Sequence, residues 1–250
     1  MTSPTQLIFV HGALVRDGAW WWQNTATLLA ARTGIRSRSL ALPSCSETAE
    51  GEPAGDQSGD QAGGLVADAA ALRRALDDAL TAGGESSAIV VGHSYGGTVI
   101  AEAGRHPAVG HLLFVSSYLP EAGLAQGAIM SGEPDPVSIG DNGDGTLSVA
   151  GYDAASFAAR FLHDADETTQ QEAWRRVTSQ SAAAFMTPTT AAGWEGVDST
   201  YLVCTDDRST SLALQRAHAA RATRSVDLPT GHHPFITRSD LVVEQLEALL

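Results

Sequence analysis

The sequence predicts an α/β protein in which helices cover both faces of a mostly parallel sheet. Short apolar runs rich in β-branched residues alternate along the chain with segments whose apolar residues recur at helical spacing. The run at 88–91 also leads directly into Gly92-His93-Ser94-Tyr95-Gly96 and then into an apolar, helix-compatible segment at 98–104. Strands that alternate with helices favour a parallel sheet between two helical layers, because each crossover places a helix on one face.

The individual elements follow in order from these patterns. We expect strands at 7–10, 35–42, 88–91, 111–116, 201–204 and 225–228, and helices at 20–33, 65–80, 98–104 and 240–250. Residues 44–64 are rich in Ser, Glu, Gly, Asp and Gln and have no apolar period, which predicts a solvated loop. In the run Trp20-Trp21-Trp22, at least two of the three side chains are expected in the core, since aromatic residues that open a helix over a sheet usually pack inward.

The interval from Pro120 to about Val197 breaks the alternation of strands and helices. It opens with a run rich in Gly, Pro and Asp as far as Gly151, and helical patterns follow at 153–162 and 167–179. Insertions of this length in a compact domain are typically lids over an active site. We therefore predict one domain over residues 1–250, with a core at about 1–120 and 197–250 and a lid at about 121–196.

Composition restricts the partners that the protein can have. The chain has 250 residues, of which 43% are hydrophobic and 18% charged, as in an ordinary globular domain. The net charge of −14 argues against nucleic acid and anionic membranes as partners, since both would repel it. Neither a leader-like beginning nor an apolar run of eighteen residues is visible, so we expect a cytoplasmic protein. The oligomeric state stays open, and a homodimer is compatible with the sequence.

The basic residues and the cysteines restrict the chemistry. All fifteen basic residues are arginine, which excludes a Schiff base on a side-chain amine, covalent pyridoxal phosphate and a phosphate loop with lysine. The two cysteines, Cys45 and Cys204, lie far apart and have no Cys-x-x-Cys partner, so a zinc site or a disulfide framework is not expected. We predict no cofactor and no metal, and a small molecule as substrate.

Three chemically active residue types follow predicted strands. Ser94 follows the strand at 88–91, Asp206 and Asp207 follow the strand at 201–204, and His232 follows the strand at 225–228. Since reactive groups of open α/β sheets lie at the carboxyl ends of the strands, these side chains share one predicted edge. A serine becomes a nucleophile when a histidine removes its proton and an acid holds that histidine, so this order predicts a catalytic triad.

At this point the sequence resembles the α/β-hydrolase superfamily. More narrowly, it resembles the small esterase and hydroxynitrile-lyase-like group, which includes plant methyl esterases and bacterial relatives. The resemblance covers nearly the whole chain, except 44–64 and 121–151. The residues that carry it are Phe9-Val10-His11-Gly12-Ala13, Gly18-Ala19-Trp20, Gly92-His93-Ser94-Tyr95-Gly96-Gly97, Cys204-Thr205-Asp206-Asp207-Arg208 and Gly231-His232-His233-Pro234-Phe235.

The resemblance implies a role for each residue of the site. Ser94 would be the nucleophile, His232 rather than His233 the base, and Asp207 rather than Asp206 the acid. The backbone N–H groups of Ala13 and Tyr95 would form the oxyanion hole. The loop from Leu14 to Asp17 is about two residues longer than in the plant esterases, so Leu14 is an alternative donor to Ala13. His11 and His93 are expected to be hydrogen-bonded structural side chains.

The leading interpretation is an esterase that cleaves a carboxylic ester or lactone of a small apolar or aromatic molecule through a serine acyl-enzyme. Four lid residues either face the pocket or pack within the lid: Trp174, Phe185, Met186 and Trp194. One alternative is a cofactor-free C–C lyase of the hydroxynitrile-lyase type. In that branch the resemblance would require a threonine where this chain has Gly12 and a lysine where it has His233, and both are missing. A cationic His233 would nevertheless keep other C–C cleavages open. The other alternative is a ligand-binding receptor on a hydrolase fold.

Overall fold

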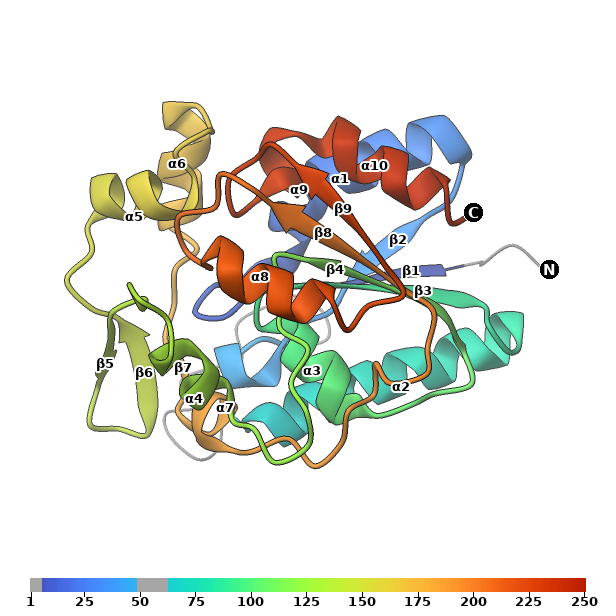
Figure 1. Cartoon of the computed structure of the whole chain (residues 1–250), viewed down its shortest axis with the longest axis horizontal. Coiled ribbons are helices and arrows are strands. Elements are labelled where there is room, and N and C mark those ends of the chain that lie inside the picture. Colours follow the sequence, from blue (N-terminus) through green and yellow to red (C-terminus); the bar gives the residue numbers. More distant parts are fainter. Residues whose placement is uncertain (1–5, 49–62) are drawn as a thin grey trace.

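The centre of the protein is a sheet of six parallel strands (Figure 1). The computed structural model describes residues 6–48 and 63–250. The strand order is β2-β1-β3-β4-β8-β9, and every neighbouring pair is parallel. The strands are β1 (Gln6–Val10), β2 (Ser37–Ser39), β3 (Ala88–His93), β4 (Val109–Val115), β8 (Ser199–Cys204) and β9 (Arg224–Leu228). The predicted mostly parallel sheet is thus confirmed.

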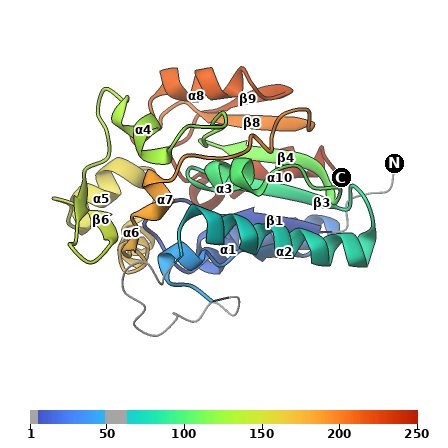
Figure 2. The same ribbon diagram turned by 90° about the horizontal axis from the view of Figure 1, so that it is seen from below.

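Helices cover both faces of this sheet, as Figures 1 and 2 show. The helices on one face are α1 (Gly18–Thr33), α9 (Pro234–Thr237) and α10 (Ser239–Glu247), and those on the other are α2 (Leu65–Gly83), α3 (Gly96–Ala103) and α8 (Leu212–Ala219). Side chains alternate along each strand, so Leu7 and Phe9 pack into one apolar core while Ile8 and Val10 pack into the other. This two-sided burial explains why the central strands are almost continuously apolar.

The tryptophans of α1 lie as predicted. Trp21 and Trp22 are buried, whereas Trp20 is only partly so. The ring of Trp22 stacks between Phe9 of β1 and Phe235 of α9, at centroid distances of 4.5 and 3.9 Å. This stack fixes α9 on the sheet and therefore fixes the loop that precedes it.

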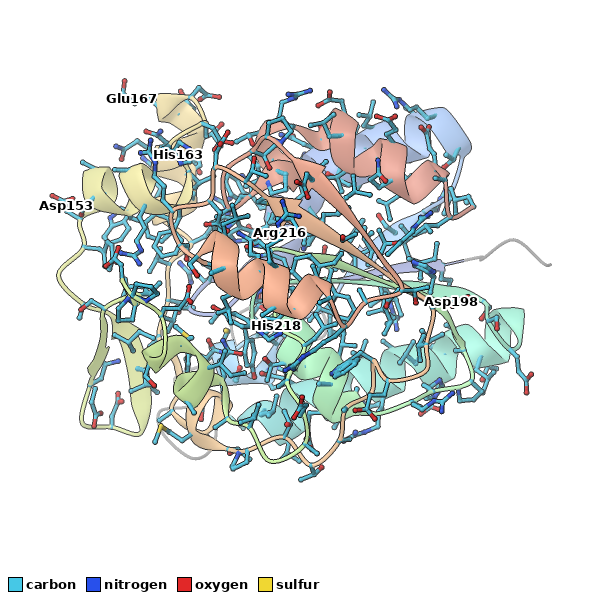
Figure 3. The ribbon with its side chains drawn as sticks, viewed as in Figure 1. Asp153, His163, Glu167, Asp198, Arg216 and His218 are labelled. Carbon is cyan, nitrogen blue, oxygen red and sulfur yellow. The ribbon has the colours of Figure 1, made fainter. Side chains whose placement is uncertain are left out.

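The segment between β4 and β8 contains a helical and β-stranded insertion beyond the carboxyl ends of the sheet strands, on the left in Figure 1. Its three short antiparallel strands have the order β5-β6-β7. Figure 3 shows Asp153 at the start of α5, where its carboxylate accepts the Ser156 N–H. The elements are α4 (Gln126–Ser131), β5 (Ile139–Asp141), β6 (Thr146–Val149), α5 (Ala154–Phe161), α6 (Glu167–Trp174), β7 (Gln180–Ser181) and α7 (Ala183–Met186).

Several element boundaries differ from the prediction. The second strand has three residues rather than the eight at 35–42, and the helix predicted at 167–179 ends at Trp174. Helix α8 was missed because its sequence mixes polar and apolar residues, and the first half of the lid contains elements too short to show a period. A short 3-10 turn, Pro43–Cys45, reaches into the loop predicted at 44–64, of which 49–62 lie outside the described residues. Within the described part of the chain, no helix combines the length and apolarity needed to cross a bilayer.

Candidate active site

Ser94 stands at a sharp turn between β3 and α3. Its φ is +50°, a value that non-glycine residues rarely adopt, and it is partly exposed between the buried residues His93 and Tyr95. The turn is possible because Gly96 has no side chain, since a Cβ there would lie 2.5 Å from the carbonyl oxygen of Val10. The strained turn therefore directs one hydroxyl away from the packed backbone, as a nucleophile elbow does.

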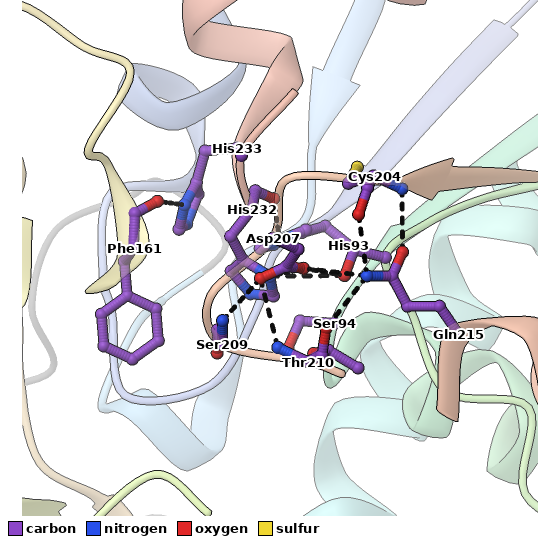
Figure 4. Close-up of polar contacts among 12 residues, drawn as sticks. His93, Ser94, Phe161, Cys204, Asp207, Ser209, Thr210, Gln215, His232 and His233 are labelled. Atoms are coloured by element: carbon purple, nitrogen blue, oxygen red, sulfur yellow. Dashed lines mark hydrogen bonds and ion pairs between the residues drawn. The ribbon is translucent and has the colours of Figure 1, made fainter. Parts of the chain in front are cut away.

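His232 and Asp207 form a buried pair beside this turn (Figure 4). His232 Nδ1–H donates to Asp207 Oδ2 at 2.7 Å, and the other carboxylate oxygen accepts the N–H groups of Ser209 and Thr210. Burial tends to raise the pKa of Asp207, but His232 and the hydrogen bonds outweigh burial and lower that pKa. Asp206 is exposed, so of the two candidate acids only Asp207 meets the histidine.

Ser94 and His232 line the same pocket. Because Asp207 holds Nδ1–H, the Nε2 atom of His232 carries the free lone pair of the neutral ring. Across residues 6–48 and 63–250, the Ser94 hydroxyl makes no direct hydrogen bond to this nitrogen (Figure 4). Such bonds between nucleophile and base are often long without substrate and tighten when it binds.

Ser116 is a third partner of the pair that the sequence did not reveal. It follows β4, is fully buried, and has a φ of +40°. Its hydroxyl donates to Asp207 Oδ2 at 2.5 Å and lies 3.3 Å from His232 Nδ1. A signal was available, because this serine ends the strand predicted at 111–116 and so lies at the same edge as Ser94.

His93 and His233 support the site as neutral side chains. His93 Nε2–H donates to the His232 carbonyl at 3.0 Å, and His233 Nδ1–H donates to the Phe161 carbonyl at 2.9 Å. Burial and the neighbouring histidines hold the pKa of His93 well below its usual value and lower the pKa of His233 to about 3. The hypothesis of a cationic His233 is therefore wrong, because burial leaves this ring uncharged.

The three histidines also form the one group in the described chain whose ring nitrogens could approach a metal ion, within 4.8 Å of one another. One nitrogen of each ring is already engaged, by Asp207, by Phe161 or by the His232 carbonyl. A zinc ion bound at about 2.1 Å needs nitrogens less than about 4.2 Å apart. The arrangement fits a histidine base with two neutral supports more simply than it fits a metal centre.

The loop after β1 shows which backbone groups are free to bind an oxyanion. The N–H of Leu14 donates to Gln180 Oε1 at 2.8 Å, so it is already engaged. The N–H groups of Ala13 and Tyr95 have no hydrogen-bond partner within the described residues, and Ala13 lines the pocket. Of the two alternatives that the sequence left open, Leu14 is therefore excluded as a free donor.

A buried chain of hydrogen bonds connects these two segments. Gln180 Nε2 donates to Ser44 Oγ at 2.8 Å, and the Ser44 hydroxyl donates to Asp68 Oδ2 at 2.6 Å. The Tyr95 hydroxyl donates to the same carboxylate oxygen at 2.7 Å. Burial raises the pKa of Asp68 to about 6. The chain of hydrogen bonds thus links Leu14, next to Ala13, with Tyr95, next to Ser94.

The pocket has a volume of about 60 Å³ and is mostly apolar. The lid contributes Met130, Val137, Val149, Phe157 and Phe161 to its lining. The four lid residues considered from the sequence lie elsewhere: Met186 is exposed, Phe185 is buried against Tyr95, Trp174 packs on Phe157, and Trp194 donates to the Pro120 carbonyl. The sequence left open whether these four side chains face the pocket or pack within the lid, and the structure excludes a place in the pocket wall.

A parallel sheet covered on both faces, with a strained serine at one strand end and a histidine–acid pair beside it, defines the α/β hydrolases as a class. Residues 7–245 match the model of the alpha/beta hydrolase family, and the chain belongs to this family.

Relatives and solved structures agree with this assignment. The chain is 25% identical over 181 residues to a protein named Probable hydrolase R7 from Phoma sp., with 68% of this chain and 72% of the relative covered. A pyrethroid hydrolase from Sphingobium faniae is 25% identical, covers 98% of this chain and 97% of its own, and has a TM-score of 0.75. The methylesterase MES16 from Arabidopsis shares the fold. It is 17% identical, the match covers 97% of each chain, and the TM-score is 0.71.

Proposed function

We propose that the protein is a serine esterase that cleaves a carboxylic ester or lactone of a small apolar or aromatic molecule through an acyl-enzyme on Ser94. The main support is the 2.7 Å hydrogen bond between Asp207 and His232 at the pocket that Ser94 also lines. This bond leaves His232 Nε2 as the base nitrogen on the side where the serine proton must go. The apolar lining supports an apolar acyl or alcohol group.

In the proposed reaction, His232 takes the proton of Ser94 as the hydroxyl oxygen attacks the ester carbonyl. The N–H groups of Ala13 and Tyr95 bind the oxyanion, and the new imidazolium is stabilised by Asp207. The imidazolium then protonates the leaving alcohol, and an acyl-enzyme remains on Ser94. Water, activated by His232, hydrolyses that intermediate, so the reaction consumes only substrate and water and needs no cofactor.

The comparisons support the reaction type. The pyrethroid hydrolase and the fungal relative are named as hydrolases, and each is 25% identical to this chain. Gly12 and a neutral His233 stand where the lyase branch requires threonine and lysine, which favours hydrolysis over C–C cleavage.

The test combines turnover with active-site labelling. The wild-type protein is expected to hydrolyse p-nitrophenyl acetate and butyrate, and Ser94→Ala to lose at least about 10³-fold in kcat. A fluorophosphonate probe should label Ser94, as peptide mapping would show. The matched control is Ser131→Ala, which removes an exposed serine hydroxyl of α4 and should leave both readouts unchanged. Labelling of another residue, or full activity in His232→Ala, would contradict the triad.

A further inference from the structure

One side of the apolar pocket carries a polar side chain with an unused hydrogen-bonding group. Gln126, the first residue of α4, lines the pocket and is 1% exposed. Its Oε1 accepts a hydrogen bond from the Thr98 hydroxyl, whereas its Nε2 has no partner. Leaving a buried amide N–H₂ group without a hydrogen bond is energetically costly, so such a group at a pocket wall points to a ligand that pairs with it.

A second polar group lies at the same place. Tyr118 lines the pocket beside the side chains of Gln126 and Thr210, both of which act to lower the pKa of its hydroxyl, although no hydrogen bond joins either of them to it. Burial raises the pKa of Tyr118 to about 12, so the hydroxyl stays neutral and can donate. The buried Thr210 hydroxyl also lacks a partner. Gln126 and Tyr118 therefore form a pair of neutral donors, which we call the amide–phenol pair.

The surrounding charges restrict what this pair can bind. Asp207 and Glu133 both act to raise the pKa of Tyr118, so the potential at its hydroxyl is negative. None of the residues that line the pocket is an arginine. A carboxylate ligand would therefore be repelled and left without a counter-ion, whereas a neutral oxygen would not.

We propose that the substrate carries a neutral hydrogen-bond acceptor in addition to the ester that is cleaved, and that the amide–phenol pair binds it. A keto, ether or second ester oxygen has the required chemistry. This proposal rests on the proposed esterase function and adds the substrate class. A pocket built to hydrogen-bond a substrate group discriminates against an analogue that lacks the group, because the buried partners are then left unpaired.

The experiment compares substrates that differ only in the acceptor. The acyl-side pair is p-nitrophenyl 4-oxopentanoate and p-nitrophenyl pentanoate, and the alcohol-side pair is 3-oxobutyl acetate and butyl acetate. In the wild type, kcat/KM for the keto ester should exceed that for its plain partner about 10- to 100-fold in one of the two pairs. The pair that shows the preference identifies the side of the substrate that carries the acceptor. The p-nitrophenyl monoester of succinate should be a poorer substrate than either p-nitrophenyl ester.

Two variants and a control connect the preference to the pair. Gln126→Met keeps the approximate volume and should reduce the preference to within about threefold of unity, while hydrolysis of the plain ester continues. Tyr118→Phe should also reduce the preference for the keto ester, and this variant tests the proposal if Gln126→Met folds poorly. Met130→Leu changes an apolar pocket residue of the same helix and should alter both members of a substrate pair equally.

Distinct results overturn distinct statements. A wild type that hydrolyses plain esters without preference in either pair, or a preference that survives in both variants, overturns the amide–phenol pair alone. A preference for the succinate monoester overturns the neutral class. A wild type that hydrolyses no ester and whose Ser94 is not labelled overturns the esterase function, and this proposal with it.

Discussion

At the scale of single residues, Ser116 determines how firmly the acid of the site is held. Its hydroxyl donates to Asp207 Oδ2, the same oxygen that accepts the His232 N–H. Hydrogen bonds to a charged group contribute about 1.5–3 kcal/mol, so loss of this bond should weaken the stabilisation of the imidazolium. We expect Ser116→Ala to lower kcat about tenfold with little change in KM, measured with p-nitrophenyl butyrate.

The positive φ of Ser116 provides a matched control. Ser116→Gly also removes the hydroxyl but relieves the strained backbone, so it should be more stable than Ser116→Ala and equally slow. If activity instead follows stability across the two variants, Ser116 has a structural role only.

The sequence predicted those residues of the site that directly follow a recognisable strand. Ser94, Asp207 and His232 each do so, and the structure brings all three to one edge. Asp68 was missed, although it lies three residues after Leu65 and four before Leu72, on the apolar stripe of α2. A carboxylate on a buried stripe is a signal, but its partners come from distant segments and cannot be inferred from local pattern.

At the scale of elements, the short strand β7 of the lid holds the loop that carries Ala13. Gln180 is fully buried, and its side chain accepts the Leu14 N–H from a position 166 residues away. We expect Gln180→Leu to lower kcat about 10- to 100-fold, since it releases the backbone next to a proposed oxyanion donor, with KM changed less than about twofold.

A conservative variant separates positioning from packing. Gln180→Glu keeps an acceptor for the Leu14 N–H but loses the donor to Ser44, so its kcat should lie between those of the wild type and Gln180→Leu. A rise in KM at unchanged kcat in both variants would show that β7 affects substrate binding and leaves the oxyanion hole intact.

Among the elements of the lid, the longer helices could be predicted from the sequence and the short strands could not. Helices α5 and α6 were found because their patterns are regular and their first residues are capped, at Asp153 and Asp166. The hairpin of β5 and β6 has only three and four residues per strand, which is too short for a period of two to stand out. Its pairing with β7, more than thirty residues later, is a tertiary contact that no local pattern records.

At the scale of the whole molecule, stability should depend on the protonation of Asp68. Burial raises its pKa from 3.8 to about 6, so the folded protein binds this proton more tightly than the unfolded chain. The stabilisation is fully present below about pH 3.8 and is lost as the pH rises through 6. At about 1.4 kcal/mol for each pH unit, the loss is on the order of 3 kcal/mol.

Urea unfolding of wild type and Asp68→Asn between pH 4 and 8 measures this dependence. The stability of the wild type relative to the variant should fall from pH 4 to about pH 6 and then level off. Asp78→Asn, on the exposed side of the same helix, should show no such change. A constant difference between wild type and Asp68→Asn would mean that Asp68 is ionised throughout this range.

The fold as a whole was predictable because each central strand is buried on both faces and therefore nearly continuous in apolar residues. The exposed strand β9 was still predicted to within one residue, but the extent of the weakly buried strand β2 was not, since surface positions constrain residue type only slightly.

The close approach at Gly12 has an evolutionary consequence. A Cβ at this position would lie 3.0 Å from His93 Nδ1 and 3.3 Å from the Cβ of Ser94. A side chain at this position would press against Ser94 and His93, so these neighbours would have to shift by a few tenths of an ångström to make room. We therefore expect substitutions at Gly12 and His93 to be coupled, so that the effect of the first depends on which residue stands at the second.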